Sequence, residues 1–237
     1  VMGGLLEKWG DGPVDPANGI YGPADVAGHW REVGEHTRMP IDGSLMIDNP
    51  VQSSYPASRV YKVIQKHHSE ELAFVYLRRA REALFAFNQN IGESSVLINI
   101  VNELGLDGNA IVKEAEAATG QQLLQEDFTL AGKLGARGFP TIIMANEENK
   151  AVKIVGSRSL DYYASGLAKI LNNQVLKPKQ QPKLSELLEQ EKLLFSKEIE
   201  VMYDVDQPKL QAFVENELAT DTFEEKELLG EKYFVNK

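Results

Sequence analysis

Residues 135–145 read Gly-Ala-Arg-Gly-Phe-Pro-Thr-Ile-Ile-Met-Ala, and this stretch decides the fold. A helical segment stops at Gly135, and Thr141–Ala145 is rich in the β-branched residues that favour strands. Pro140 lies directly before that strand, although proline donates no hydrogen bond to a β-ladder. Such a proline is tolerated where the Phe139–Pro140 bond is cis and the chain turns tightly. The stretch therefore predicts a cis-proline loop that leads into a β-strand.

The sequence after this strand predicts a hairpin that is closed by a helix. Residues 146–150 are polar and indicate a turn, and Ala151–Val155 indicates a second strand. Residues 160–171 carry apolar side chains at helical spacing, which favours an amphipathic helix. The expected order after the cis-proline is therefore strand, strand, helix.

The sequence before the cis-proline loop is predominantly helical. Apolar side chains recur there at intervals of three and four residues, and capping residues or glycines separate the segments. Residues 39–55 are expected to be irregular because Pro, Gly and Asn punctuate them. Residues 1–6 indicate the end of a strand. The expected helices are residues 23–37, 56–68, 69–87, 93–104, 109–119 and 121–134.

The last part of the chain is expected to be a separate helical extension. Residues 173–183 carry two prolines and several Lys and Gln, which is typical of a linker. Residues 184–203 predict a helix with a break near Ser196, and residues 207–219 predict another. A hairpin is expected over residues 223–235, and helices followed by a hairpin resemble a small winged-helix unit.

Charge and composition exclude several classes of protein. The net charge is −10, and residues 184–237 hold fourteen acidic but only six basic side chains. This acidity argues against nucleic-acid or anionic-membrane partners. The longest apolar run falls far short of the roughly 20 residues that a membrane span needs. The sequence contains no cysteine, which excludes disulfides, thiolate catalysis and cysteine-bound zinc.

Three further segments precede the cis-proline stretch in an order that is typical of one known family. They are Val1-Met2-Gly3-Gly4-Leu5, His29-Trp30 and Asp127-Phe128. Together they resemble the DsbA-like family, most closely its FrnE-like branch of protein-disulfide isomerases, over about residues 1–171. The resemblance implies an α/β, thioredoxin-like fold with a large helical insertion and a C-terminal helical extension. The expected organisation is a thioredoxin domain over residues 1–172 with the insertion at about 23–134, a linker over 173–183 and an acidic extension over 184–237.

The same resemblance assigns the residues of a substrate loop. Pro140 matches the family's cis-proline, and Phe139 and Thr141 match the residues on either side of it. In the family this loop holds an extended peptide beside a Cys-x-x-Cys motif. Trp30 is a candidate for lining the same groove, although buried packing in the helical block is the simpler interpretation.

The departure from the family is the Cys-x-x-Cys motif, whose place lies before Val1. We expect the first strand, the first helix and the cysteines to lie upstream, because a protein that lost only its thiols would keep those elements. The leading hypothesis is a cytoplasmic thiol–disulfide oxidoreductase or protein-disulfide isomerase acting on protein substrates. It needs no cofactor, and without cysteine this chain could still bind a substrate but could not catalyse.

A non-enzymatic adaptor is the main alternative. Residues 195–199 and 201–204 resemble the C-terminal extension of a DsbA-like adaptor that delivers a redox-responsive transcription regulator to the Clp protease. Such an adaptor would hold a protein partner at the groove, the insertion or the extension. A glutathione-transferase-like protein is disfavoured, because the helices here precede the cis-proline strand.

Other kinds of site find no support. His29 and His36 are two helical turns apart, and His67 and His68 diverge on a helix, so no metal site is expected. No serine has a base at a recognisable spacing, and no glycine-rich phosphate loop is present. The acidic side chains lie in turns or caps, which gives no support to glycosidase chemistry.

Overall fold

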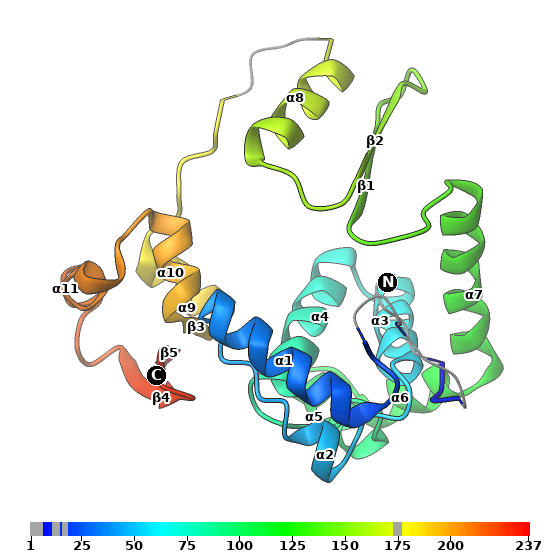
Figure 1. Ribbon diagram of the computed structural model, residues 1–237, viewed down its shortest axis with the longest axis horizontal. Coiled ribbons are helices and arrows are strands. Elements are labelled where there is room, and N and C mark those ends of the chain that lie inside the picture. The colour runs from blue at the N-terminus through cyan, green and yellow to red at the C-terminus, as the bar shows by residue number, and fades with distance from the viewer. Residues whose placement is uncertain (1–6, 11–14, 16–18, 173–176) are drawn as a thin grey trace. The chain divides into compact units, whose positions relative to one another are not determined.

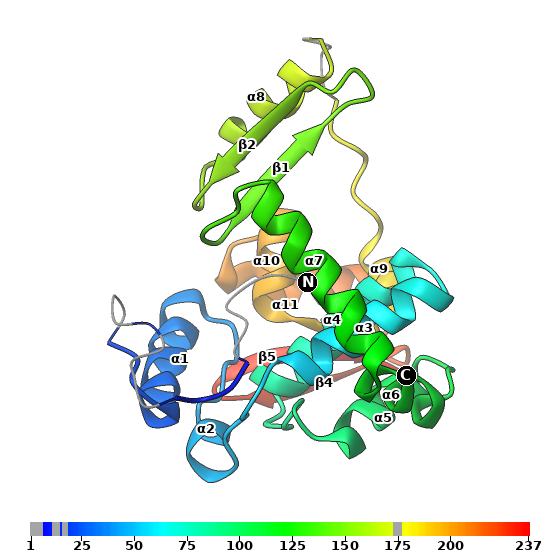
Figure 2. The ribbon, with the colours of Figure 1, turned by 90° about the vertical axis from the view of Figure 1, so that its right-hand side faces the viewer.

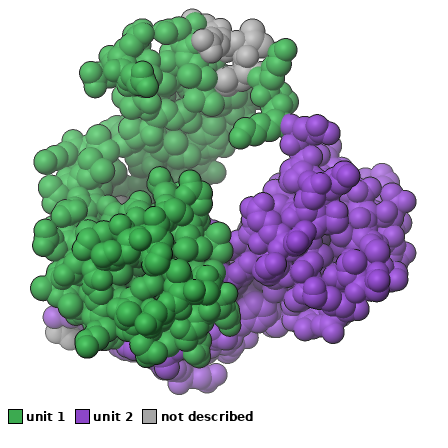
Figure 3. Space-filling view, turned by 180° about the vertical axis from the view of Figure 1, so that it is seen from behind, with its two compact units in different colours: residues 1–7, 53–76, 97–179 green, residues 8–52, 77–96, 180–237 purple. Residues whose placement is uncertain are grey.

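The computed structural model describes residues 7–10, 15, 19–172 and 177–237 of the chain (Figure 1). The strand end expected in residues 1–6 lies outside these residues, and the domain boundaries expected at 172 and 183 stay predictions. Within the described part, no helix is both long and apolar enough to cross a membrane. The chain divides into two compact units (Figure 3): unit 1 has residues 1–7, 53–76 and 97–179, and unit 2 has residues 8–52, 77–96 and 180–237.

The helices of unit 1 form where apolar residues recur at helical spacing. In α3, Val60, Val63 and Ile64 share one buried face, and this helix packs against α6 and α7. Tyr76 is completely buried and donates its hydroxyl to the carbonyl of Ala57 at 3.1 Å. The helices are α3 (Tyr55–His67), α4 (Glu70–Phe85, whose residues up to 76 belong to unit 1), α5 (Ser94–Glu103, whose residues from 97 belong to unit 1), α6 (Gly108–Glu116) and α7 (Ala118–Lys133).

The predicted hairpin and closing helix of unit 1 are confirmed. Strands β1 (Thr141–Ala145) and β2 (Ala151–Val155) are antiparallel, with Ile142 opposite Ile154. Helix α8 (Leu160–Ile170) lies against this hairpin, as Figures 1 and 2 show. The two approach closely at Gly166, where a Cβ would come within 3.1 Å of the Ile154 side chain.

Unit 2 begins with α1 (Pro23–Thr37), whose bounds match the expectation. The carboxylate of Asp25 accepts the N–H groups of Tyr21 and Gly22, both at 3.0 Å, and so supports the start of the helix. Residues 39–55 are not wholly irregular as expected. A short helix, α2 (Leu45–Asp48), forms there because Leu45 and Met46 find a buried environment in the fold.

The C-terminal part of unit 2 has the arrangement of a winged-helix unit. Its three strands are antiparallel in the order β3-β5-β4, so the first strand pairs with the last. Its core is a cluster that includes Leu188, Ile199, Val214 and Phe234. The elements are α9 (Leu184–Glu191), β3 (Leu193–Phe195), α10 (Ser196–Tyr203), a 3₁₀ turn (Gln207–Lys209), α11 (Leu210–Glu217), β4 (Phe223–Leu228) and β5 (Glu231–Asn236).

The break expected near Ser196 is present in this unit, but the residues at the break form a strand that was not expected. The helix expected over residues 184–203 is interrupted before Ser196, because Leu193–Phe195 forms strand β3. Helix α9 is followed by Lys192, its C-cap residue, which has a left-handed backbone with φ 62°. Leu194 then pairs with Phe234 of β5. The partner strand comes from about 40 residues further along the chain, and local helical periodicity carries no signal for such a pairing.

Candidate functional site

The predicted cis-proline loop is present in unit 1. The Phe139–Pro140 peptide bond is cis, which confirms the expectation from the sequence. Gly135 ends the preceding helical turn with a φ of 65°, a conformation that glycine adopts without steric cost. The hydroxyl of Thr141 donates to the carbonyl of Gly138 at 2.6 Å and closes the turn. Local hydrogen bonds therefore fix the loop between α7 and β1.

The loop borders an open, mainly apolar cavity of about 400 Å³. Three of its large apolar side chains face solvent: Leu130 is 55% exposed, Phe139 51% and Leu134 44%. No described residue forms a hydrogen bond with the N–H or the C=O of Phe139. The cavity is lined by Asp127, Leu130, Ala131, Leu134, Ala136, Phe139, Pro140, Thr141 and Ile143, and we call it the cis-proline groove.

The cis-proline groove has an apolar wall but, among its lining residues, no group for thiol chemistry. Its one ionisable lining residue is Asp127, whose carboxylate pairs with Lys62 at 2.8 Å. The sequence holds no cysteine, and thiol–disulfide exchange begins with attack by a thiolate. An apolar wall next to unpaired backbone groups is instead suited to an extended peptide, which can bind like an added strand.

The candidate site residues from the sequence fall in both units. Phe139, Pro140 and Thr141 all line the cis-proline groove. Trp30, in α1 of unit 2, packs its ring edge-on against Phe85 with centroids 4.8 Å apart. This contact supports the packing interpretation of Trp30, and its role in lining the groove stays a prediction.

Two leucines at the C-terminal end of α7 line the groove, and no sequence pattern singles them out. Leu130 lies in the last turn of α7, and Leu134, four residues later, is the C-cap residue just before Gly135. Apolar residues at that spacing ordinarily indicate the buried face of a helix. The one sequence feature that could have indicated an exposed, partner-binding position is that both leucines lie directly before the cis-proline loop.

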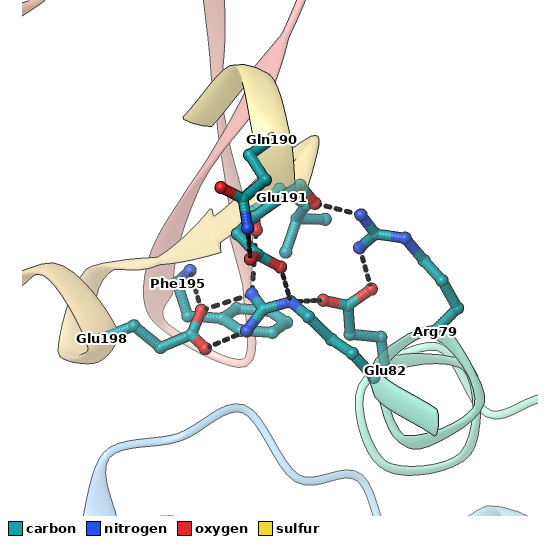
Figure 4. A network of polar contacts seen from close by, with 8 residues as sticks. Arg79, Glu82, Gln190, Glu191, Phe195 and Glu198 are labelled. Carbon is teal, nitrogen blue, oxygen red and sulfur yellow. Dashed lines mark hydrogen bonds and ion pairs between the residues drawn. The ribbon is translucent and has the colours of Figure 1, made fainter. Parts of the chain in front are cut away.

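A network of charged side chains within unit 2 joins α4 to the C-terminal elements (Figure 4). The guanidinium group of Arg78 lies 2.9 Å from Glu82, 3.0 Å from Glu191 and 2.8 Å from Glu198. Arg79 pairs with Glu82 at 2.6 Å and donates to the backbone carbonyl of Glu191. Burial raises the pKa of Glu82, although both arginines favour its charged form. The sequence shows only charged pairs at helical spacing, which are ordinarily solvated.

A second charged contact within unit 2 ties the end of α1 to the same elements. Arg38, which follows α1, binds both oxygens of Glu200 at 2.8 and 2.9 Å and both oxygens of Glu231 at 3.0 and 2.9 Å. The side chain of Glu200 is only 5% exposed. Planar two-point contacts of this kind are among the strongest that arginine makes. They anchor α10 and β5 to the residue after α1.

Comparisons with known proteins supply named relatives. The chain is 28% identical over 184 residues to the ClpXP adapter protein SpxH of Bacillus subtilis (strain 168), which covers 76% of this chain and 61% of that protein. It is 26% identical over 214 residues to the ClpXP adapter protein SpxH of Halalkalibacterium halodurans, which covers 87% of this chain and 67% of that protein. The chain thus spans about three fifths to two thirds of the length of these relatives.

A solved structure resembles the chain in fold. It is the cytosolic disulfide reductase DsbM from Pseudomonas aeruginosa, with a TM-score of 0.51 and 24% identity. The match covers 63% of this chain and 77% of DsbM. At this identity the likeness concerns the fold alone, and it agrees with the predicted α/β, thioredoxin-like class.

The relatives overturn the leading functional hypothesis. The prediction of a thiol–disulfide oxidoreductase or protein-disulfide isomerase is wrong, because the relatives that cover most of the chain are ClpXP adapters. The absence of cysteine from the sequence agrees with this correction, since no other side chain here replaces a thiolate. This correction does not affect the predicted fold, because proteins of one fold can have many different activities. A thioredoxin family model matches residues 22–165, more than half of the sequence, and the chain therefore belongs to the thioredoxin family.

Proposed function

We propose that this protein is a non-catalytic, cytoplasmic adaptor that binds a partner protein and presents it to a protease of the ClpXP type. The observation that carries the proposal is the match of ClpXP adapters to 76% and 87% of the chain. Two features support it: the cis-proline groove exposes apolar side chains that a partner could cover, and the sequence lacks the cysteine that catalysis needs. Such a protein would bind its partner without catalysing a reaction on it.

The cis-proline groove is the proposed binding site for the partner. An extended segment of the partner would form backbone hydrogen bonds with the N–H and C=O of Phe139, as in strand addition. Its apolar side chains would cover Leu130, Leu134 and Phe139, which are otherwise exposed. Thr141 and Pro140 would shape the floor of the contact.

The C-terminal extension is proposed as a second contact with a protein. A winged-helix unit that binds nucleic acid needs a basic surface. Here the hairpin of β4 and β5 exposes Glu224, Glu225 and Glu227, so its charge is unfavourable for phosphates. On α10, Val201 is 71% exposed and Met202 42% exposed, which suits a protein partner.

A degradation assay tests the proposal. Purified ClpXP and ATP are incubated with the redox-responsive transcription regulator that the family resemblance implies, with and without this protein. We expect the rate of degradation to rise with the adaptor concentration and then saturate. No acceleration at any concentration of the adaptor contradicts the proposal.

The groove is tested in the same assay with a matched pair of variants. Phe139→Asp places a charge at the mouth of the groove, and we expect it to abolish most of the acceleration. Phe74→Asp is the control, since Phe74 is 54% exposed in α4, close to the 51% of Phe139. Equal activity of the two variants would leave the adaptor function standing but remove the cis-proline groove from it.

A further inference from the structure

A second cavity lies within unit 2, apart from the lining of the cis-proline groove. It has a volume of about 340 Å³ and lies between α4, residues 39–41 and the start of α10. Ligand pockets have volumes of roughly 300–1,000 Å³, so it can hold one large side chain. Six of its lining residues are apolar: Met39, Pro40, Ile41, Phe85, Ala86 and Phe195.

The walls of this cavity are well supported by the fold. Arg78, Arg81, Glu82 and Phe85 stand at intervals of three and four residues, so they form one face of α4. Phe195 is buried and packs against the ring of Tyr233, with centroids 6.0 Å apart. The apolar walls therefore persist whether or not a ligand is bound.

The charges around the opening are unevenly paired. Arg78 is paired with Glu82, Glu191 and Glu198, and Glu82 also pairs with Arg79. Arg81 is exposed, and no described residue forms an ion pair or a hydrogen bond with its side chain. A guanidinium group that no described residue pairs therefore lies beside an apolar cavity, in a chain whose net charge is −10.

We propose that this cavity docks a segment of a partner protein that carries a large apolar side chain next to an aspartate or glutamate. The apolar side chain fills the cavity, and the neighbouring carboxylate pairs with Arg81 in the planar geometry that suits guanidinium groups. The rest of the acidic surface repels such a segment, so the attraction at Arg81 also selects where it binds.

The same charges disfavour a polyanionic ligand. Glu82 and Glu198 line the cavity together with Arg81. A phosphate-rich molecule would meet these carboxylates, whereas a single carboxylate needs only Arg81, which no described residue pairs. The charge pattern thus fits an acidic protein segment better than a nucleic acid or an anionic lipid.

Peptide titration of the full chain tests this docking site. The probes are acetyl-Gly-Ser-Leu-Asp-Gly-Ser-amide and two relatives, one with Asn for Asp and one with Ala for Leu. The protein carries ¹³C-labelled Met and Ile methyl groups, so that Met39 and Ile41 report on the cavity and Ile143 reports on the cis-proline groove. We expect the Leu-Asp peptide to shift the signals of Met39 and Ile41. The Asn peptide should bind about three to five times more weakly, the effect of one partly exposed ion pair.

Two arginine variants make the test specific. Arg81→Gln should bind the Asp and Asn peptides equally, since the cation that pairs with the Asp carboxylate is gone. The variant should fold normally, because Arg81 is exposed. Arg137→Gln is the matched control in unit 1 and should keep the preference for Asp. Shifts confined to Ile143, a preference that survives Arg81→Gln, or no shift at any soluble concentration would each overturn the docking site.

This docking site rests on the proposed adaptor function, because it names the chemistry of the partner. The two fail separately. If the protein accelerates degradation by ClpXP but no peptide shifts Met39, the adaptor function stands and the docking site falls. If the Leu-Asp peptide binds through Arg81 but ClpXP is not assisted, the site stands and its use in protease delivery falls.

Discussion

Replacing Arg78 by Met should destabilise unit 2 strongly. The side chain of Arg78 is 21% exposed and faces three carboxylates, of which Glu82 is the most buried at 11% exposure. Methionine fills a similar length but leaves Glu191 and Glu198 without this cation. The removal of one partner from a buried ion pair costs about 3–5 kcal/mol. Because Glu82 keeps its bond to Arg79, we expect about 2–3 kcal/mol here.

Tryptophan fluorescence measures this effect in the right part of the molecule. The two tryptophans, Trp9 and Trp30, both belong to unit 2. Urea unfolding followed by their fluorescence should show the midpoint of Arg78→Met lowered by about 1 M, for a slope of roughly 2–3 kcal/mol per M. Arg81→Met, three residues further along α4, is the control and should change stability by less than about 0.5 kcal/mol.

A double-mutant cycle separates the ion pair from the loss of side-chain packing. If the charge network carries the effect, Arg78→Met together with Glu198→Gln should cost less than the sum of the two single changes, by about 1 kcal/mol or more. Equal midpoints for Arg78→Met and Arg81→Met would refute the reasoning. They would mean that the network of Figure 4 is as weak as an ordinary surface cluster.

Three further outcomes are expected. Burial raises the pKa of Glu200, but hydrogen bonds from Arg38 and Lys197 outweigh it and hold the pKa below its ordinary value of 4.5. The stability that this carboxylate contributes is present above pH 4.5 and lost in acid, so unfolding measured across pH should show the protein and Glu200→Gln converging as the pH falls. In α7, Gly132→Ala should raise the melting temperature by the equivalent of about 0.5–1 kcal/mol, since a Cβ there meets no atom within 4 Å, whereas Gly120→Ala should lower it, since its Cβ would overlap the carbonyl of Ala115. In an insulin-reduction assay with dithiothreitol the chain should give no rate above the blank, and catalysis by this cysteine-free protein would contradict the mechanism.

The cis-proline loop was predictable because its cause is local. A proline before a β-branched strand, with a glycine at the end of the preceding helix, leaves few backbone solutions. The assignment of Phe139, Pro140 and Thr141 to one groove came from the resemblance to the DsbA-like family and not from this local pattern. The apolar contribution of Leu130 and Leu134 could not be predicted, because periodicity alone does not distinguish a buried stripe from an exposed one.

The function was harder to predict than the fold. The resemblance to disulfide isomerases rested on residues that position a substrate, and an adaptor that binds the same way keeps those residues. The element that separates the two activities is a cysteine pair, which this sequence does not contain. Fold and groove therefore implied binding, and catalysis was an inference by analogy.

The sequence by itself determined the helices, the hairpin Thr141–Val155 and the cis-proline, because periodicity and backbone sterics act within a few residues. Only the tertiary structure decided strand β3, which needs Leu194 to meet Phe234. It also decided that Arg78 is neutralised while Arg81, one turn away, pairs with none of the residues that the structure describes. The two arginines look alike in the sequence. What distinguishes them is which segments, distant along the chain, fold back beside α4, and that depends on long-range packing that no local pattern encodes.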